Sequence, residues 1–339
     1  MLRWDDVNAR ARGLATHLLR PEQVSALAAA ADLPDLLRRL ERAGCRLVLD
    51  PGPVTPAAIE AAIRRLAASK LRLLARWCAR RAPALAIIFE EEDRRSLRAL
   101  IRGAVAGAAP EARLAGTIPT TSLPLRALEE LARQTDLRSL GALLAVWGNP
   151  YAVPLRKVEN LEHPDLLRLE VGLGREFTRR ALEAARRGDR VLHHHVRDAV
   201  DLENTWAALL LAGDGGDVEA PECFLSGGDR ITPMVFQDAA TAPDRAEACR
   251  RLARAFGSRP LGRALIRAST RLPDLDDELL AAQLTERRTA ARLDPLSSAP
   301  LLAYALALRA ETRMLGRLVW GVALGLPAAA LAAEAAQSA

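Results

Sequence analysis

The chain has 339 residues, of which 50% are hydrophobic, 27% are charged and only 4% are aromatic. This composition excludes an intrinsically disordered polypeptide, and the abundance of alanine, leucine and arginine predicts an all-α fold rather than a sheet. The net charge of +6 comes almost entirely from arginine interspersed with Asp and Glu, which favours a solvated surface over a compact nucleic-acid-binding stripe.

Neither a disulfide framework nor a membrane-spanning helix is predicted. The four cysteines are far apart and form no CxxC pair, which is typical of reduced thiols. A long uncharged run covers residues 318–333 and contains Pro327, whereas a spanning helix needs about 20 apolar residues. The charged start at Trp4-Asp-Asp has no apolar segment of a secretory signal. We therefore expect no transmembrane segment.

Prolines and glycines divide the chain into pieces of helical length, because proline lacks the amide donor and clashes with the preceding helical turn. Short helical segments beginning at an aspartate recur along the chain, at Asp32, Asp136 and Asp244. Loops at 116–124 and 223–228, each followed by a helix, precede the second and third of these segments. The order of elements therefore repeats.

A longer helix with an acidic motif recurs three times at nearly constant spacing. The three copies read Asp93-Arg-Arg-Ser96, Asp201-Leu-Glu-Asn204 and Glu311-Thr-Arg-Met314, and their acidic residues lie 108 and 110 positions apart. Apolar residues follow one face of each helix, as in Leu97, Leu100 and Ile101. An acidic residue on such a face can simply pair with an arginine one turn away, but that pairing does not account for the threefold recurrence.

We interpret the chain as three similar helical units, covering residues 1–103, 104–212 and 213–339. Each unit runs from a loop through short helices to a longer helix with the acidic motif. Three units of this size predict one funnel-shaped, pseudo-threefold body in which the like helices face a central axis. This period is far longer than the roughly 20–50 residues of stacked solenoid repeats.

No assembled catalytic, cofactor or metal site is visible. The sequence contains no G-x-x-x-x-G-K-[ST] loop for a nucleoside triphosphate and no G-x-S-x-G nucleophile motif. His193, His194 and His195 are adjacent, so on a helix they diverge by about 100° each and cannot share one ion. The segment 213–217 has the composition of a connector. We expect a non-enzymatic protein with no cofactor and no small-molecule substrate.

Taken together, these features resemble the C/d subunit family of the V-type and archaeal A-type rotary ATPases. The resemblance covers essentially the whole chain and rests on the order of several segments: Trp4-Asp-Asp-Val-Asn-Ala-Arg10-Ala-Arg12, the three acidic motifs, Phe224-Leu-Ser-Gly-Gly, and Tyr304 to Pro327 through Glu311 and Trp320-Gly. The family pattern favours Asn three positions after the acid. Only Asn204 keeps it here, so the chain resembles a divergent member.

The resemblance implies a mechanical role. Members of that family bind no cofactor and lie on the cytoplasmic face of the membrane, where they join the central shaft of the rotary motor to the ring of membrane proteolipids. The expected partners are therefore the shaft subunit and that ring, with coupled transport of protons or sodium ions. Carried over residue by residue, the resemblance marks Asp93, Asp201, Asn204 and Glu311 as expected shaft-socket residues.

A second hypothesis belongs to another class of protein. The basic charge and the arginine content are also compatible with a helical-repeat scaffold or regulator that binds nucleic acid. Steeply salt-dependent binding to duplexes or single strands would distinguish it from the rotary subunit.

Overall fold

The computed structural model describes residues 4–78, 81–115, 117–158, 164–213, 220–271 and 275–338. All regular elements in these ranges are helices, so the predicted all-α fold is confirmed. The short segment predicted as a connector falls largely on residues 214–219, outside the described residues.

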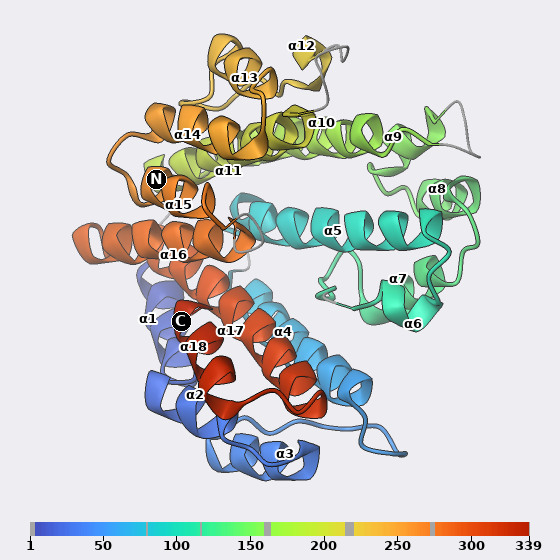
Figure 1. Ribbon diagram of the computed structural model, residues 1–339, viewed down its shortest axis with the longest axis vertical. Helices are drawn as coiled ribbons and strands as arrows, with labels where there is room; N and C mark the ends of the chain where they lie inside the picture. Colours follow the sequence, from blue (N-terminus) through green and yellow to red (C-terminus); the bar gives the residue numbers. More distant parts are fainter. Residues whose placement is uncertain are drawn as a thin grey trace.

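Short helices alternate with pairs of long ones along the chain (Figure 1). The first third contains α1 (Asp5–Ala15), α2 (Pro21–Ala28), α3 (Leu33–Arg42), α4 (Pro56–Cys78) and α5 (Ala82–Val105). The middle third contains α6 (Pro110–Arg113), α7 (Leu125–Ala132), α8 (Leu137–Val146), α9 (Ala152–Arg156), α10 (Leu166–Ala185) and α11 (Arg190–Leu211). The last contains α12 (Ala220–Cys223), α13 (Pro233–Ala240), α14 (Arg245–Phe256), α15 (Pro260–Ala268), α16 (Leu275–Leu293), α17 (Ala299–Ala323) and α18 (Ala328–Ser338).

The recurrent aspartates of the short segments are helix N-caps. Asp32, Asp136 and Asp244 precede α3, α8 and α14, and each accepts a hydrogen bond from the backbone N–H three residues later, at 2.7, 2.8 and 2.7 Å. Such a cap stabilises a helix by about 1 kcal/mol because it satisfies an amide that has no partner within the helix. Local capping chemistry therefore explains why these aspartates recur.

The three motif helices are α5, α11 and α17, and each packs against a set of short helices. Helix α5 contacts α7 and α8, α11 contacts α13 and α14, and α17 contacts α2 and α3. The last motif helix therefore packs on the short helices of the N-terminal third, as Figure 1 shows for α17 above α2 and α3. The proposed boundaries fall in the last turn of α5 and directly after α11. The division into three units about a pseudo-threefold axis stays a prediction.

Separate apolar clusters hold these packings together. One joins α5, α7, α8 and α10 and includes Leu100 and Phe177, while a second lies between α11, α13, α14 and α15 and includes Phe236. A third joins α2, α3 and α4 to α17 and includes Leu36 and Val319. Each such side chain contributes roughly 1.5–3 kcal/mol through its burial.

The apolar C-terminal run begins in the last turns of α17, where it is largely buried, whereas residues 323–330 are exposed. Leu318 and Val319 are 2% and 0% exposed, and the indole of Trp320 donates a hydrogen bond to Glu60 at 2.9 Å. In the described part of the chain, every helix is too short or too polar to cross a bilayer.

Candidate functional site

Asp93, the acidic residue of the first motif, binds a loop that follows its own helix. The residue is 3% exposed, and its carboxylate accepts hydrogen bonds from the hydroxyls of Thr120 and Ser122. The Thr120 hydroxyl also accepts the backbone N–H of Leu123 at 3.0 Å. Asp93 therefore fixes the turn that leads into α7.

Asp201 and Asn204, in the second motif, bind the loop that leads into α13. The Asp201 carboxylate accepts three successive backbone N–H groups, those of residues 229–231, at 3.1, 2.9 and 3.0 Å. The Asn204 amide donates to the carbonyl of Leu225 and accepts its N–H, both at 2.8 Å. Both side chains are 0% exposed. A Cβ at Gly228 would overlap Asp201 Oδ1, so only glycine lets this loop approach so closely.

Glu311, in the third motif, makes the corresponding contact with the N-terminal part of the chain. Its carboxylate accepts the backbone N–H of Leu19 at 2.6 Å, in the loop before α2, and forms an ion pair with Lys70 at 3.3 Å. Ser96 and Met314, which take the position of Asn204 in the other two motifs, do not form such a pair of hydrogen bonds with a loop backbone. The Ser96 hydroxyl has no hydrogen-bond partner among the described residues, and Met314 is buried in an apolar cluster.

The three acidic motif residues therefore share one contact pattern. Each binds the loop that precedes a set of short helices, at 117–124, 224–231 and 16–20. The sequence predicts the recurrence of the acids, but it does not reveal that the recurrent partner is a loop. Their place in a shaft contact stays a prediction.

Burial changes the acidity of Asp93. Removal from water raises the pKa of Asp93 to about 7, against the effect of the two hydroxyl donors, which lower it. In the unfolded chain an aspartate has a pKa of about 3.9. The folded state therefore binds a proton more tightly than the unfolded state, and the contribution of Asp93 to stability decreases as the pH rises from about 4 to about 7.

We expect Asp93→Asn to remove this pH dependence, because the amide stays neutral and can still bond to both hydroxyls. Relative to the wild type, the variant should gain about 2–4 kcal/mol in free energy of unfolding between pH 4 and pH 7.5. Urea unfolding of both proteins across this range measures the difference. Asp136→Asn is the matched control, since the pKa of Asp136 is lowered by the Ser139 N–H and its trend should have the opposite sign. A difference that does not vary with pH would contradict the prediction for Asp93.

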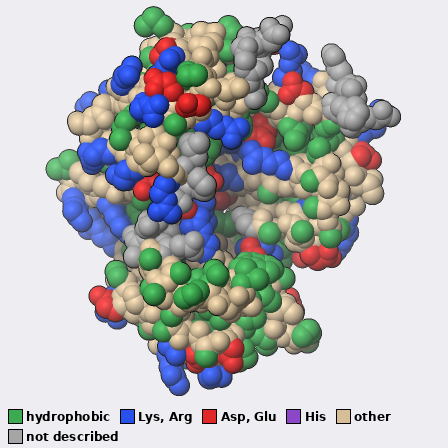
Figure 2. All heavy atoms as spheres, in the orientation of Figure 1, with side chains coloured by type: hydrophobic (Ala, Val, Ile, Leu, Met, Phe, Trp, Pro, Cys, Tyr) green, Lys and Arg blue, Asp and Glu red, His purple; other side chains and the backbone are tan. Residues whose placement is uncertain are grey.

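A charged cavity of about 410 Å³ lies between the long helices α5, α10, α11, α16 and α17. In Figure 2, basic side chains gather around a hollow in the middle of the molecule. The charged residues that line the cavity are Arg94, Arg95, Arg98, Arg102, Arg309, Arg313, Glu91, Glu170, Glu203 and Asp276. The four expected socket residues do not line this cavity.

Buried ion pairs organise the cavity wall. Glu203 on α11 pairs with Arg94 and, at 2.6 Å, with Arg98, both from α5. Burial alone would raise the pKa of Glu203, but the charges of the two arginines outweigh it and hold the pKa at about 2. Glu170 on α10 accepts a bidentate pair of hydrogen bonds from Arg102 at 2.5 and 2.7 Å. The wall is therefore a fixed arrangement of charges.

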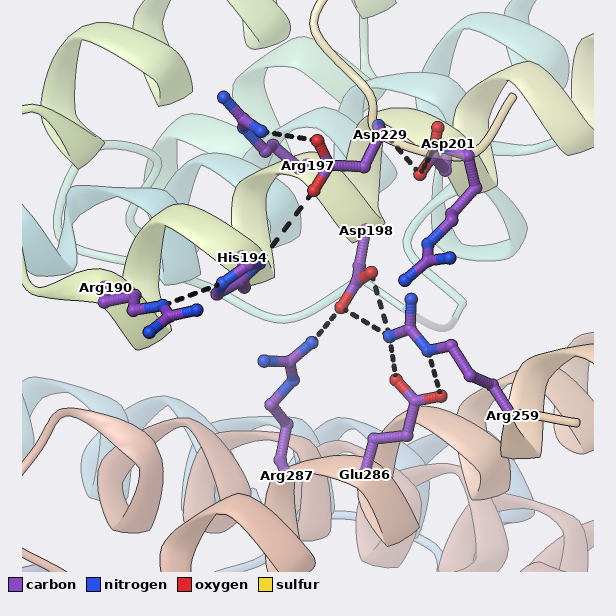
Figure 3. Close-up of polar contacts among 10 residues, drawn as sticks. Arg190, His194, Arg197, Asp198, Asp201, Asp229, Arg259, Glu286 and Arg287 are labelled. Carbon is purple, nitrogen blue, oxygen red and sulfur yellow. Dashed lines mark hydrogen bonds and ion pairs between the residues drawn. The ribbon is translucent and has the colours of Figure 1, made fainter. Parts of the chain in front are cut away.

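A second polar network joins α11 to α16 at the edge of the cavity (Figure 3). Asp198 on α11 is 6% exposed and accepts hydrogen bonds from Arg287 on α16 and from Arg259 at 3.0 and 3.1 Å. Arg259, which precedes α15, also pairs with Glu286 at 2.6 Å. The three adjacent histidines lie on the preceding turns of α11. His195 is buried 3.2 Å from Glu91, whereas His194 is exposed and faces Asp229.

The described residues contain no cluster of His, Cys, Asp and Glu side chains suited to a metal ion. What they define is an all-helical protein with a charged cavity between its long helices. Within that class the chain belongs to the ATP synthase (C/AC39) subunit family, whose model matches residues 7–334. It is also 26% identical over 248 residues to the C subunit of the A-type ATP synthase from Haloferax volcanii, an alignment that covers 71% of this chain and 70% of the relative.

Proposed function

We propose that this chain is a non-catalytic rotor subunit of an A/V-type rotary ATPase, and that it couples the central shaft to the membrane proteolipid ring on the cytoplasmic face. The family match over residues 7–334 carries the proposal. In this role the protein transmits torque for proton or sodium transport, in either the hydrolysing or the synthesising direction. The bound partners are the shaft and the ring, without nucleic acid, cofactor or small-molecule substrate.

The charges of the cavity wall support the proposal that the shaft binds there. Its wall presents six arginines from α5 and α17 together with four carboxylates, which suits a partner surface of mixed charge. We propose that these side chains meet the shaft. Asp201 and Asn204 would then act on the socket indirectly, because the loop that they hold contributes Leu225 to the cavity lining. The place of Asp93 and Glu311 in the shaft contact stays a prediction.

The proposal is tested by affinity capture of the tagged full-length chain from gently solubilised membranes of its source, followed by mass spectrometry. The wild type should recover a coiled-coil shaft protein and a small proteolipid in fixed stoichiometry. Recovery of neither, from membranes that contain the rest of the complex, would reject the function. Recovery of nucleic acid that is lost at high salt would favour the scaffold hypothesis instead.

A charge-reversed variant tests the cavity. Arg95 and Arg313 are partly exposed on its wall, with 40% and 37% of their side chains accessible. We expect Arg95→Glu with Arg313→Glu to weaken shaft binding about tenfold or more, while the proteolipid is still recovered. Arg126→Glu is the matched control, because Arg126 is 89% exposed and lies outside the cavity lining. Unchanged recovery of the shaft would place its binding surface elsewhere.

A further inference from the structure

A second, larger hollow lies away from the charged cavity. This groove has a volume of about 600 Å³ and is enclosed by α1, the loop before α2, the C-terminal end of α16 and the first turns of α17. Its lining residues are Ala11, Arg12, Ala15, Leu18, Leu19, Arg20, Pro21, Arg288, Ala291, Arg292, Pro295, Pro300, Ala303, Tyr304 and Ala307. The volume lies within the range of about 300–1,000 Å³ that is typical of small-molecule sites.

The charges of this groove all have one sign. Its four charged lining residues are Arg12, Arg20, Arg288 and Arg292, and the described residues place no carboxylate in the lining. Arg12, Arg20 and Arg292 are exposed and form no ion pair with the described residues. Burial, and then the charge of Arg292, lower the pKa of Arg288. Basic side chains gather over this end of α16, at the left of Figure 2. The groove therefore favours an anion.

The rest of the lining is apolar except for one hydroxyl. Alanine, leucine and proline side chains form most of the surface, and Tyr304 on α17 contributes a phenol. Tyr304 is 2% exposed, and its hydroxyl has no hydrogen-bond partner among the described residues. Burial and the charge of Glu311 raise the pKa of Tyr304 well above its ordinary value, so the hydroxyl stays protonated. Because this hydroxyl has no accessible surface, it does not face the groove, and the arginines supply the polar contacts of the lining.

We propose that this groove binds one molecule of a long-chain fatty acid, with the carboxylate held by the exposed arginines Arg12, Arg20 and Arg292 and the acyl chain against the apolar lining. The proposal combines charge complementarity with an apolar surface, which a free inorganic anion would leave unused. The site is independent of the proposed shaft socket, since the two linings share no residue.

The test is isothermal titration of the full-length chain with oleate, kept below the concentration at which oleate forms micelles. We expect saturable binding of one oleate per chain, and no binding of acetate, which lacks the acyl chain. Methyl oleate, which lacks the charge, should bind at least about tenfold more weakly, because each lost charge-assisted hydrogen bond costs about 1.5–3 kcal/mol.

Variants separate the site from general attraction to a basic protein. Arg12→Glu with Arg292→Glu should weaken oleate binding about tenfold or more, whereas the same reversal at two exposed arginines away from the groove, Arg126→Glu with Arg138→Glu, should leave it unchanged. Tyr304→Phe should leave oleate binding unchanged and keep or increase the stability of the free protein, because the hydroxyl that it removes is buried and unpartnered.

Three outcomes would overturn the proposal. The first is the absence of saturable oleate binding to a folded wild-type chain. The second is that the Arg12/Arg292 variant and the Arg126/Arg138 variant weaken oleate binding equally, which would mean that only the net charge of the protein matters. The third is tighter binding of an acidic amphipathic peptide than of oleate, with displacement of oleate by that peptide, which would assign the groove to a protein partner.

Discussion

Replacing Asp201 with alanine should lower the free energy of unfolding by about 3 kcal/mol, because three backbone N–H groups, one buried and two partly buried, would lose their common acceptor. The carboxylate is 0% exposed and binds the N–H groups of residues 229–231 at distances between 2.9 and 3.1 Å. Burial raises the pKa of Asp201, while these three donors oppose that shift. Urea unfolding at neutral pH measures the loss, and Asp201→Asn, which keeps one acceptor oxygen, should lose less.

Two further variants make this prediction specific. Gly228→Ala should destabilise the same loop while the Asp201 carboxylate itself is kept, because the added Cβ would overlap Asp201 Oδ1 and displace the loop. Asp238→Ala is the control, since the Asp238 carboxylate pairs with Arg251 but is 57% exposed. Such a surface pair contributes about 0–1 kcal/mol. If Asp201→Ala cost no more than Asp238→Ala, the loop would not depend on this anchor.

Removal of Glu203 is the second change for which we expect a large effect. Arg94, its partner, is 2% exposed and lies 4.3 Å from the ring centroid of Phe177. Glu203→Leu would leave this cation buried without its nearest counter-charge, at an expected cost of about 3–5 kcal/mol. Replacing both partners, as Arg94→Met with Glu203→Leu, should recover most of the loss, because an apolar pair of similar volume tolerates burial. A double variant no more stable than Glu203→Leu would show that Arg94 is not the cause.

The pair of Glu203 and Arg94 also predicts that the protein loses stability at low pH. The pKa of Glu203 is held at about 2 in the folded protein, below the value of about 4.3 for an unpaired glutamate. Its contribution to stability is therefore complete above the unfolded pKa and is lost as the pH falls from about 4 to about 2. The difference in unfolding free energy between wild type and Glu203→Leu should shrink over this interval. A constant difference would mean that the carboxylate is not charged in the folded state.

Local sequence patterns predict the elements of this fold better than the contacts between them. The helices follow from composition and proline spacing, and the recurrence of Asp32, Asp136 and Asp244 follows from N-capping, which acts within four residues. The loop partners of Asp93 and Asp201 lie 27 to 30 positions further along the chain. No local rule selects such partners.

The cavity and the groove are even harder to predict from the sequence than these loop contacts, because they form only through tertiary packing. Arg94, Arg98 and Arg102 recur at helical spacing in the sequence, but arginine is so common in this chain that the spacing alone does not mark a cavity wall. The groove combines residues 11–21 with residues 288–307, which meet only because α1 packs on α17. From the sequence alone, the arginines of the groove therefore resemble parts of separate, solvated helix faces.

The contact between Glu311 and Leu19 spans 292 positions and has a consequence for synthesis. Ribosomes make chains from the N-terminus, and domains generally fold as units as they emerge. Here the apolar cluster of α2, α3 and α4 includes Met314, Leu315 and Leu318 from α17. Helices α2, α3 and α4 thus leave the ribosome well before α17, and their shared apolar face stays uncovered until α17 has been made.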